Sequence, residues 1–198
     1  MKYPLFLPRK LPKHVDPSDR EVVGDERFVD CRFWVNEDGR IIEAWMSGRN
    51  DACFLPDATR HILLLDKLSA FVASSFNFYG RYVNESIDVA ISSGRIKRLI
   101  LNGHVNLTDA ALQNVASTPL LELSVTGASL SCNILRLIRQ CRLIEMINLC
   151  DNKMFFENAE PFNEIPSLSR LHLSSDMVSL GFRSSLRSGI DCVIVSSA

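Results

Sequence analysis

The feature that most constrains the fold is an apolar phrase that recurs every 24 residues in the second half of the chain. The phrase has the form apolar-x-x-apolar-x-apolar. Its four full copies are Ile96, Leu99 and Leu101; Leu120, Leu123 and Val125; Ile144, Ile147 and Leu149; and Leu168, Leu171 and Leu173. A looser copy, Ile190, Val193 and Val195, follows after 22 residues. A fixed period in the twenties is typical of stacked repeats, in which each unit buries its apolar edge against its neighbours.

The segments between the phrases predict helices or turns that alternate with the strands. Thr108 is expected to cap a helix that begins at Asp109, and Ser131 to cap one that continues through Ile138. Pro161 and Pro166 interrupt the next segment, so its helix should be short or irregular. Residues 96–198 are therefore predicted to be an α/β repeat array of parallel strands and helices.

A β-hairpin is predicted before the repeats. Apolar residues alternate over 29–35, Asn-Glu-Asp-Gly at 36–39 supplies a turn, and 41–46 forms the return strand. Trp34 and Trp45 lie at comparable distances from this turn, which favours one face for both. Two interpretations are open: a cross-strand aromatic pair that covers the sheet, or an aromatic anchor for a protein partner.

Two helices are predicted between the hairpin and the repeats. Asp57 is a plausible N-cap for the first, whose apolar positions at helical spacing are Ile62, Leu65, Leu68 and Phe71. The second spans about 84–91 and stops at the Ser-Ser-Gly sequence of residues 92–94. The stretch 72–95 has the length of a repeat but lacks its phrase, which predicts a degenerate capping unit.

These patterns divide the chain into three parts. Residues 1–25 are rich in proline and charge and are expected to form an extended leader. Residues 26–95 should form an α+β N-terminal cap that contains the hairpin, and residues 96–198 should form the repeat array. The predicted fold class is α/β.

The phrase followed by a capped helix resembles a leucine-rich repeat. The sequence from Ile96 to Leu112 is similar to the cysteine-containing type found in F-box proteins, and the likeness covers about half of the chain. It implies a short leucine-rich-repeat solenoid, with an Asn after each phrase that satisfies backbone groups in the turn. Asn152 fills that position, whereas His104, Ala128 and Asp176 fill it elsewhere. The hairpin and helix resemble, more weakly, the F-box-associated domains of nematode proteins.

A binding surface is predicted on the strands, because side chains that flank the apolar phrase point away from the core. The polar and apolar side chains of this face resemble a protein-binding surface, although a merely solvated sheet face is the alternative. We also assign Trp34 and Trp45 to the candidate protein-binding residues. The repeat positions are Arg98, Ile100 and Asn102; Glu122, Ser124 and Thr126; Met146 and Asn148; and Arg170 and His172, with Cys150 and Ser174 completing the columns.

The sequence gives no positive indication of an enzyme. His172, Ser174 and Asp176 include the residue types of a catalytic triad, but alternate positions of one strand cannot form its geometry. None of the six cysteines forms a C-x-x-C pair, so we predict no metal site. The sequence has no Walker loop and no G-x-G-x-x-G, G-x-S-x-G or H-E-x-x-H motif, so we predict no cofactor and no catalytic residue. Hydrophobic residues make up 46% of the 198 residues and the formal net charge is −1, which predicts a globular domain without bulk attraction to nucleic acid. No apolar run approaches the roughly 20 residues needed to span a bilayer.

The leading functional hypothesis is a non-enzymatic adaptor that binds another protein, in the cytoplasm or nucleus. The F-box resemblance implies substrate recognition in a ubiquitin-ligase-like complex. One alternative is an assembly factor, like the short leucine-rich proteins that serve respiratory complexes. Another is an RNA-associated scaffold with a basic convex strip formed by Arg136, Arg139, Arg142, Arg183 and Arg187. A second copy that covers the edge strand at 190–195 is a further possible partner.

Overall fold

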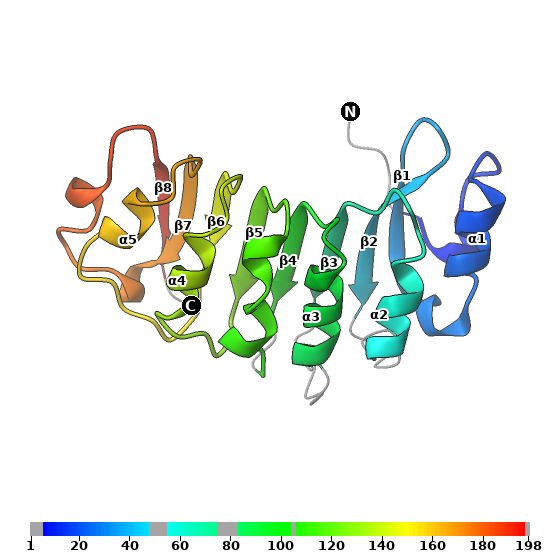
Figure 1. The fold of residues 1–198 in the computed structure, drawn as a ribbon, viewed down its shortest axis with the longest axis horizontal. Coiled ribbons are helices and arrows are strands. Elements are labelled where there is room, and N and C mark those ends of the chain that lie inside the picture. Colours follow the sequence, from blue (N-terminus) through cyan, green and yellow to red (C-terminus); the bar gives the residue numbers. More distant parts are fainter. Residues whose placement is uncertain (1–5, 48–54, 75–82, 104–105, 197–198) are drawn as a thin grey trace.

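The protein has an α/β fold built on one continuous sheet. The computed structural model describes residues 6–47, 55–74, 83–103 and 106–196. Within these ranges, eight strands form the sheet in the order of the sequence (Figure 1). The first two strands are antiparallel and every later pair is parallel. The strands are β1 (Arg32–Val35), β2 (Ile41–Ser47), β3 (Ala70–Ser74), β4 (Arg98–Asn102), β5 (Glu122–Thr126), β6 (Met146–Asn148), β7 (Arg170–Ser174) and β8 (Asp191–Val195).

The helices from α2 to α5 cover one side of the sheet, and no helix of the described ranges lies over the opposite side, here called the open face (Figure 1). The α-helices are α1 (Pro17–Val23), α2 (Pro56–Ile62), α3 (Val83–Ser92), α4 (Ile134–Ile138) and α5 (Glu160–Asn163). Short 3-10 turns are η1 (Pro8–Lys10), η2 (Glu26–Phe28), η4 (Asp109–Leu112), η5 (Val115–Ser117), η6 (Ser175–Met177) and η7 (Arg183–Ser185). None of the helices in the described ranges is long and apolar enough to cross a membrane.

The 24-residue period is the pairing register of the central strands. Leu99 pairs with Leu123, and Leu123 pairs with Ile147 on the next strand. These side chains are fully buried on the helical side of the sheet. Because side chains alternate between the two faces of a strand, an equal spacing of the buried positions keeps every unit in register. The predicted period is confirmed for β4 to β7.

The last copy of the phrase is shifted by one residue from its predicted position. Leu171 pairs with Cys192 and Leu173 with Ile194, so these residues, and not Val193 and Val195, continue the buried rows. Cys192 and Ile194 are half-buried, whereas Val193 and Val195 are 40% and 46% exposed. A slip of one residue moves every side chain of a strand to the other face. The prediction of Ile190, Val193 and Val195 as a fifth copy is therefore wrong.

The repeat geometry also begins earlier than predicted. Leu68, Phe71 and Ala73 form a phrase of their own and are buried, and β3 pairs with β4 in the common parallel register. The helix predicted through Phe71 ends at Ile62, because a turn leads from there into β3. Its N-cap is Leu55, and Asp57 lies in the first turn. The prediction that residues 72–95 form a degenerate cap without an apolar phrase is therefore wrong. The phrase of this unit is Leu68, Phe71 and Ala73, which begins before residue 72.

The N-terminal segment is not wholly extended, because it contains α1. The Asp16 side chain accepts a hydrogen bond from the Ser18 N–H at 2.9 Å, and Pro17 occupies the first helical turn. This combination is a standard helix start. The buried carboxylate of Asp19 accepts hydrogen bonds from the Arg40 guanidinium at 2.9 and 3.1 Å, which fixes α1 to the hairpin.

The hairpin and most connecting elements agree with the sequence expectations. β1 and β2 pair around the turn at 36–39, and α3 includes the predicted helix at 84–91. The helix between the Pro161 and Pro166 positions is short, as expected. Thr108 makes no side-chain cap in η4, and Asn133 rather than Ser131 is the N-cap of α4. One buried apolar cluster extends through the hairpin and the repeats, so the core has no break at residue 95.

A left-handed backbone position follows three consecutive strands at the same spacing. Gly103, Gly127 and Asp151 have φ values of 73°, 62° and 60°. Glycine adopts this region without the steric cost of a Cβ, whereas aspartate tolerates it with local hydrogen bonds. At Asp151 the Ser174 hydroxyl accepts from its N–H at 2.8 Å. The tight turn is thus retained in a unit that lacks glycine.

Candidate interaction surface

All twelve predicted binding residues lie on the open face. Residues that pair on neighbouring strands have side chains on the same face of the sheet. The pairing registers therefore place the twelve residues in two rows, and part of a third, that run across the strands. The first row is Trp34, Glu43, Ala70, Arg98, Glu122, Met146, Arg170 and Asp191. The second is Arg32, Trp45, Val72, Ile100, Ser124, Asn148, His172 and Val193. Asn102 and Thr126 belong to the third row.

A charge network of three residues, Glu43, Arg98 and Glu122, lies in the first row. Arg98 Nη1 donates to Glu43 Oε2 at 3.0 Å, and its Nε donates to Glu122 Oε2 at 2.7 Å. The Glu43 side chain is only 4% exposed, and it also accepts a hydrogen bond from the Trp45 indole. A buried carboxylate is costly unless it is paired and hydrogen-bonded, which this network provides. The surface charge at this point is therefore held in one geometry.

Ala70 is the residue that allows this network to form. It lies in the row between Glu43 and Arg98, on the strand that separates theirs. Strands are about 4.8 Å apart, so Arg98 must reach across one complete strand to Glu43. A methyl side chain leaves this path open, and Ala70 is itself 2% exposed.

The two carboxylates stabilise the charged form of Arg98. Burial lowers the pKa of its guanidinium, but the hydrogen bond and charge of Glu122, together with Glu43, outweigh that effect, and the pKa is raised. With one cation between two carboxylates, the network carries one net negative charge. The Arg98 and Glu122 side chains are 40% and 21% exposed, compared with 4% for Glu43, so solvent or a partner reaches the network at Arg98 and Glu122.

An apolar patch borders the charge network. Trp45, Val72 and Ile100 are neighbours in the second row. Val72 is 2% exposed, whereas Trp45 and Ile100 are half-buried. Trp34 pairs with Glu43 while Trp45 pairs with Arg32, so the two indoles lie diagonally on the same face. The prediction of one face for both tryptophans is confirmed, and both are half-buried.

The polar side chains farther along the open face are partly engaged with one another. The Thr126 hydroxyl donates to Asn102 Oδ1 at 3.1 Å, and Asn148 Oδ1 accepts from the Cys150 N–H at 3.1 Å. Ser124 is buried. Met146, Asn148 and His172 are half-buried and Arg170 is exposed, so these side chains are among the accessible points of this half.

The residues suggested as a catalytic triad are not arranged as one. The Ser174 hydroxyl donates to Asp151 Oδ1 at 3.1 Å, and Ser174 is buried. Its partner on the next strand is Val195, whereas that of His172 is Val193. Ser174 therefore helps to fix the turn after β6.

Asn152 performs the turn role that the repeat resemblance implies. Its side chain is buried, and Nδ2 donates to the carbonyls of Val125 and Leu149, both at 2.7 Å. Its Oδ1 accepts from the Ala128 N–H at 3.1 Å. One side chain thus satisfies backbone groups of two successive turns. His104 lies outside the described residues, as does Cys53.

Sequence reasoning missed further residues of the open face, because it did not identify β3, misplaced β8 and assigned only the two tryptophans of the hairpin to this face. The useful signals were the Leu68, Phe71 and Ala73 phrase and the alternation within β2. Both place the intervening residues on the open face. The missed residues are Arg32, Glu43, Ala70, Val72, Asp191, Val193 and Val195.

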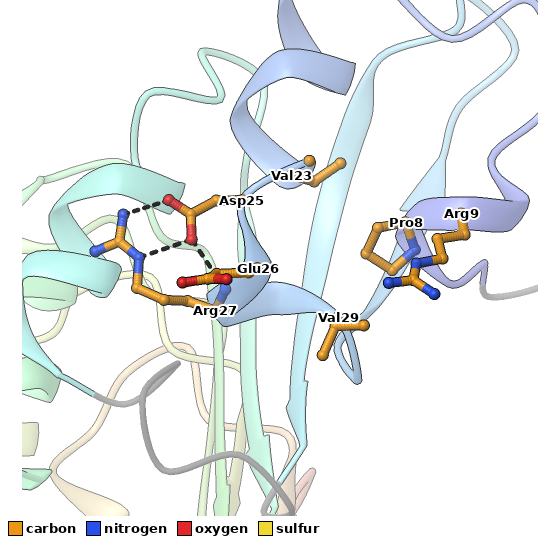
Figure 2. Close-up of a pocket in the computed structure, with 8 residues that line it drawn as sticks. Pro8, Arg9, Val23, Asp25, Glu26, Arg27 and Val29 are labelled. Atoms are coloured by element: carbon orange, nitrogen blue, oxygen red, sulfur yellow. Dashed lines mark hydrogen bonds and ion pairs between the residues drawn. The ribbon is translucent and has the colours of Figure 1, made fainter.

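A hollow of about 600 Å³ lies at the N-terminal end of the molecule, away from the rows (Figure 2). Figure 2 shows Pro8 and Arg9 opposite Asp25, Arg27 and Val29. The Arg27 side chain donates to both Asp25 oxygens, at 2.7 and 2.9 Å. Hydrogen bonds from Arg27 lower the pKa of Asp25 to about 2. Asp25 and Arg27 thus neutralise each other at the hollow's lining, to which Val23 and Val29 add apolar surface.

The proposed basic strip is partly used inside the molecule. Arg139 Nη1 lies 2.6 Å from Glu164 Oε2. Arg187 Nη2 donates to the carbonyls of Ile165 and Leu168 at 2.8 and 2.9 Å, which satisfies backbone acceptors after α5. Two of the five arginines therefore have structural partners.

No protein-family model matches the chain, and a search of curated proteins found no match. The geometry of the open face is therefore the basis on which a function is proposed.

Proposed function

We propose that this chain is a short leucine-rich-repeat-like solenoid that acts as a non-enzymatic adaptor and binds another protein through its open face. The observation that carries the proposal is the common placement of the twelve predicted residues on a face that no described helix covers. A broad, continuous strand surface suits a protein partner, because specific protein interfaces need a larger contact area than a small ligand offers.

The energetic centre of this surface is expected near Trp45, Ile100 and Glu122. Tryptophan is enriched among residues that dominate binding free energy. Trp45 is held by its hydrogen bond to Glu43, and Glu122 is held by Arg98. Side chains that are already ordered lose less conformational entropy when a partner binds. The ordering of Trp45 and Glu122 by these hydrogen bonds therefore supports a binding role for this part of the open face.

The likeness to the repeats of F-box proteins supports a specific setting for the adaptor. In that setting the chain would recognise a substrate protein in a ubiquitin-ligase-like complex, in the cytoplasm or nucleus. A role as an RNA scaffold has less support, because Arg139 and Arg187 of the basic strip contact the protein itself. An assembly-factor role would use the same open face.

The test compares open-face variants with a matched variant on the helical side. Affinity capture from the native source is carried out with wild type, with Ile100→Asp, with Arg170→Glu, and with the control Arg136→Glu on α4. We expect both open-face variants to lose the proteins that wild type enriches, while the control retains them. Thermal unfolding of each variant checks that the fold is intact. Equal capture by folded open-face variants would contradict the proposal.

Salt dependence separates the adaptor from the RNA scaffold. Binding that releases counterions from six to ten phosphates weakens by about 10³–10⁵ between 50 and 200 mM salt. An interface centred on Trp45 and Ile100 should change by less than about tenfold over the same range. The measurement is retention of the captured species at the two salt concentrations, with and without ribonuclease.

A further inference from the structure

The two edge strands of the sheet differ in how they are covered. Outside β1, Phe6 forms an antiparallel bridge with Phe33, and their backbone N–H and C=O groups exchange hydrogen bonds of 2.9 and 2.8 Å. At the other edge, β8 pairs with β7, and within the described residues no strand pairs with its outer side. An uncovered edge presents backbone donors and acceptors to any strand that approaches.

The outer side of β8 has few of the features that block strand pairing. Natural edge strands are protected by lysine, proline, bulges or inward-pointing charge. β8 has the sequence Asp-Cys-Val-Ile-Val, in regular register with β7 along all five residues. Asp191, its charged residue, lies at the first position, and the remaining four residues are apolar. The strand is therefore open to pairing over its central part.

The hydrogen-bond pattern specifies which backbone groups are available. The Asp191 N–H donates to the Ser169 carbonyl at 2.8 Å, so Asp191 is bonded toward β7. In a parallel ladder this direction alternates along the strand. Val193 and Val195 are then bonded toward β7 as well, while the N–H and C=O groups of Cys192 and Ile194 point outward.

We propose that β8 pairs antiparallel with β8 of a second copy of this chain, with the two-fold axis at Val193. In this register Cys192 is opposite Ile194 of the other copy. The outward N–H and C=O groups of these two residues exchange hydrogen bonds with each other across the interface. Val193 is opposite its own counterpart in a non-hydrogen-bonded pair, in which Cα atoms are about 4.5 Å apart. All five residues of each strand are then paired. The other two symmetric registers, centred on Cys192 or Ile194, pair three.

Side-chain chemistry favours this occupant. On the open face two Val193 side chains meet, and β-branched cross-strand pairs stabilise a sheet. On the helical side the smaller Cys192 faces the larger Ile194, and both are half-buried in the single chain. Asp191 is opposite Val195 of the other copy, so the two carboxylates are kept apart. A second copy thus meets the shape and charge requirements of β8 with no like charges opposed.

The expected dimer is weak. Five residues a side bury much less than the roughly 1,200 Å² of a stable specific interface. Dimerisation should therefore depend on protein concentration and should leave the rest of the open face accessible. Because β8 lies at the end of the rows, this inference does not depend on the proposed adaptor function.

Disulfide trapping tests the register directly. In a background in which Cys53, Cys132 and Cys192 are serine, single variants Val193→Cys and Val195→Cys are exposed to oxidised glutathione. This oxidant accepts the two electrons that are released as two thiols form one disulfide. Val193→Cys meets its own counterpart within the Cα range of a disulfide, whereas Val195→Cys meets Asp191. We expect covalent dimer to form about tenfold or more faster for Val193→Cys. Equal rates, or faster trapping of Val195→Cys, would overturn the proposal.

Sedimentation equilibrium provides the second measurement on unmodified protein. Wild type should show a concentration-dependent dimer, and Val193→Lys should remain monomeric because two ammonium groups would meet at the axis. The matched control is Leu180→Lys, because Leu180 is fully exposed in a loop. Unfolding curves verify that both variants fold. Wild type that stays monomeric at every concentration, or dimers that persist in Val193→Lys, would refute the pairing.

Discussion

The units around β2 and β3 share their sheet geometry with the units from β4 to β7, but not their sequence spacing. Phe71 pairs with Ala44, 27 positions earlier, and with Leu99, 28 positions later. From Leu99 onward the partners are 24 positions apart, until Cys192 follows Leu171 after 21. The sheet requires that buried side chains alternate correctly within each strand. It does not require connections of equal length, so a strict period reveals only part of the array.

The early units also differ in side-chain size. Ala44 and Ala73 occupy positions of the apolar phrase at which the central units have larger aliphatic side chains. Both alanines are fully buried. Ala70 on the opposite face leaves the path for Arg98. Small residues at these positions let aromatic and charged neighbours occupy the space. The early units are thus equivalent in backbone geometry and specialised in packing.

The largest expected effect tests whether β3 belongs to the same core as the central repeats. Phe71→Ala should lower the free energy of unfolding by about 3–5 kcal/mol and Leu123→Ala by about 2–5 kcal/mol, because each removes a fully buried side chain. Urea denaturation provides the measurement. The control Leu143→Ala, at an exposed leucine, should change it by less than about 0.5 kcal/mol. A loss below about 1 kcal/mol at Phe71 would place β3 outside the common core.

The turn after β6 should be the most sensitive of the connecting turns. Asn152→Ala removes one side chain that serves backbone groups of two turns, and leaves buried carbonyls without a donor. We expect a loss of about 2–3 kcal/mol in unfolding free energy. Gln113→Ala, at an exposed residue, serves as the control and should be neutral. A neutral result at Asn152 would show that water replaces the amide.

The charge network joins the early and central units, and its two carboxylates should differ in effect. Glu43→Gln should destabilise the protein by about 1–3 kcal/mol, because this side chain is buried and receives hydrogen bonds from Arg98 and Trp45. Glu122→Gln, at the more exposed end, should cost less than about 1 kcal/mol. Equal costs would show that the network does not anchor the early units through Glu43. Urea denaturation of the two variants and of wild type measures both changes in unfolding free energy.

The smallest effect concerns the N-terminal end. The pKa of Asp25 is lowered from 3.8 to about 2 in the folded protein, so folding is favoured above the unfolded value. This contribution is lost as pH falls from about 4 to 2, because protonation then removes the hydrogen bonds from Arg27. Solvent exposure limits it to less than about 1 kcal/mol. Asp25→Asn should show a shallower loss of stability over this pH window than wild type, measured by urea denaturation. A wild-type slope in the variant would contradict the assignment.

Much of the fold was predictable where one strong pattern had a single interpretation. The phrases from Ile96 to Leu173 fixed the faces of β4 to β7, and the Asn-Glu-Asp-Gly turn fixed the hairpin. The twelve candidate residues followed from those faces. At Leu65, Leu68 and Phe71 two periods coincide, because a spacing of three fits a helix and the start of the strand phrase equally. The helical interpretation concealed β3 and with it Ala70 and Val72.

The last strand shows the opposite difficulty. Its residues from Ile190 to Val195 are almost all apolar, so the sequence cannot tell which alternate set is buried. The backbone bond from Asp191 to Ser169 decides the register, and this bond exists only once the chain has returned to β7. That register exposes Val193 and Val195, which lie on the last strand in the order of the sheet.

The sequence by itself determined the strand faces of the regular repeats, because burial of alternate side chains is a local consequence of an apolar pattern. It also identified Asn152 as the side chain that completes a turn. Only the tertiary structure decided that Glu43 meets Arg98 across Ala70, since 55 positions separate the two charges. It also decided that Phe6 covers the edge at β1, while no strand of the described residues covers the outer side of β8. Such features depend on which strands lie next to each other, and the packing of the whole sheet determines that order.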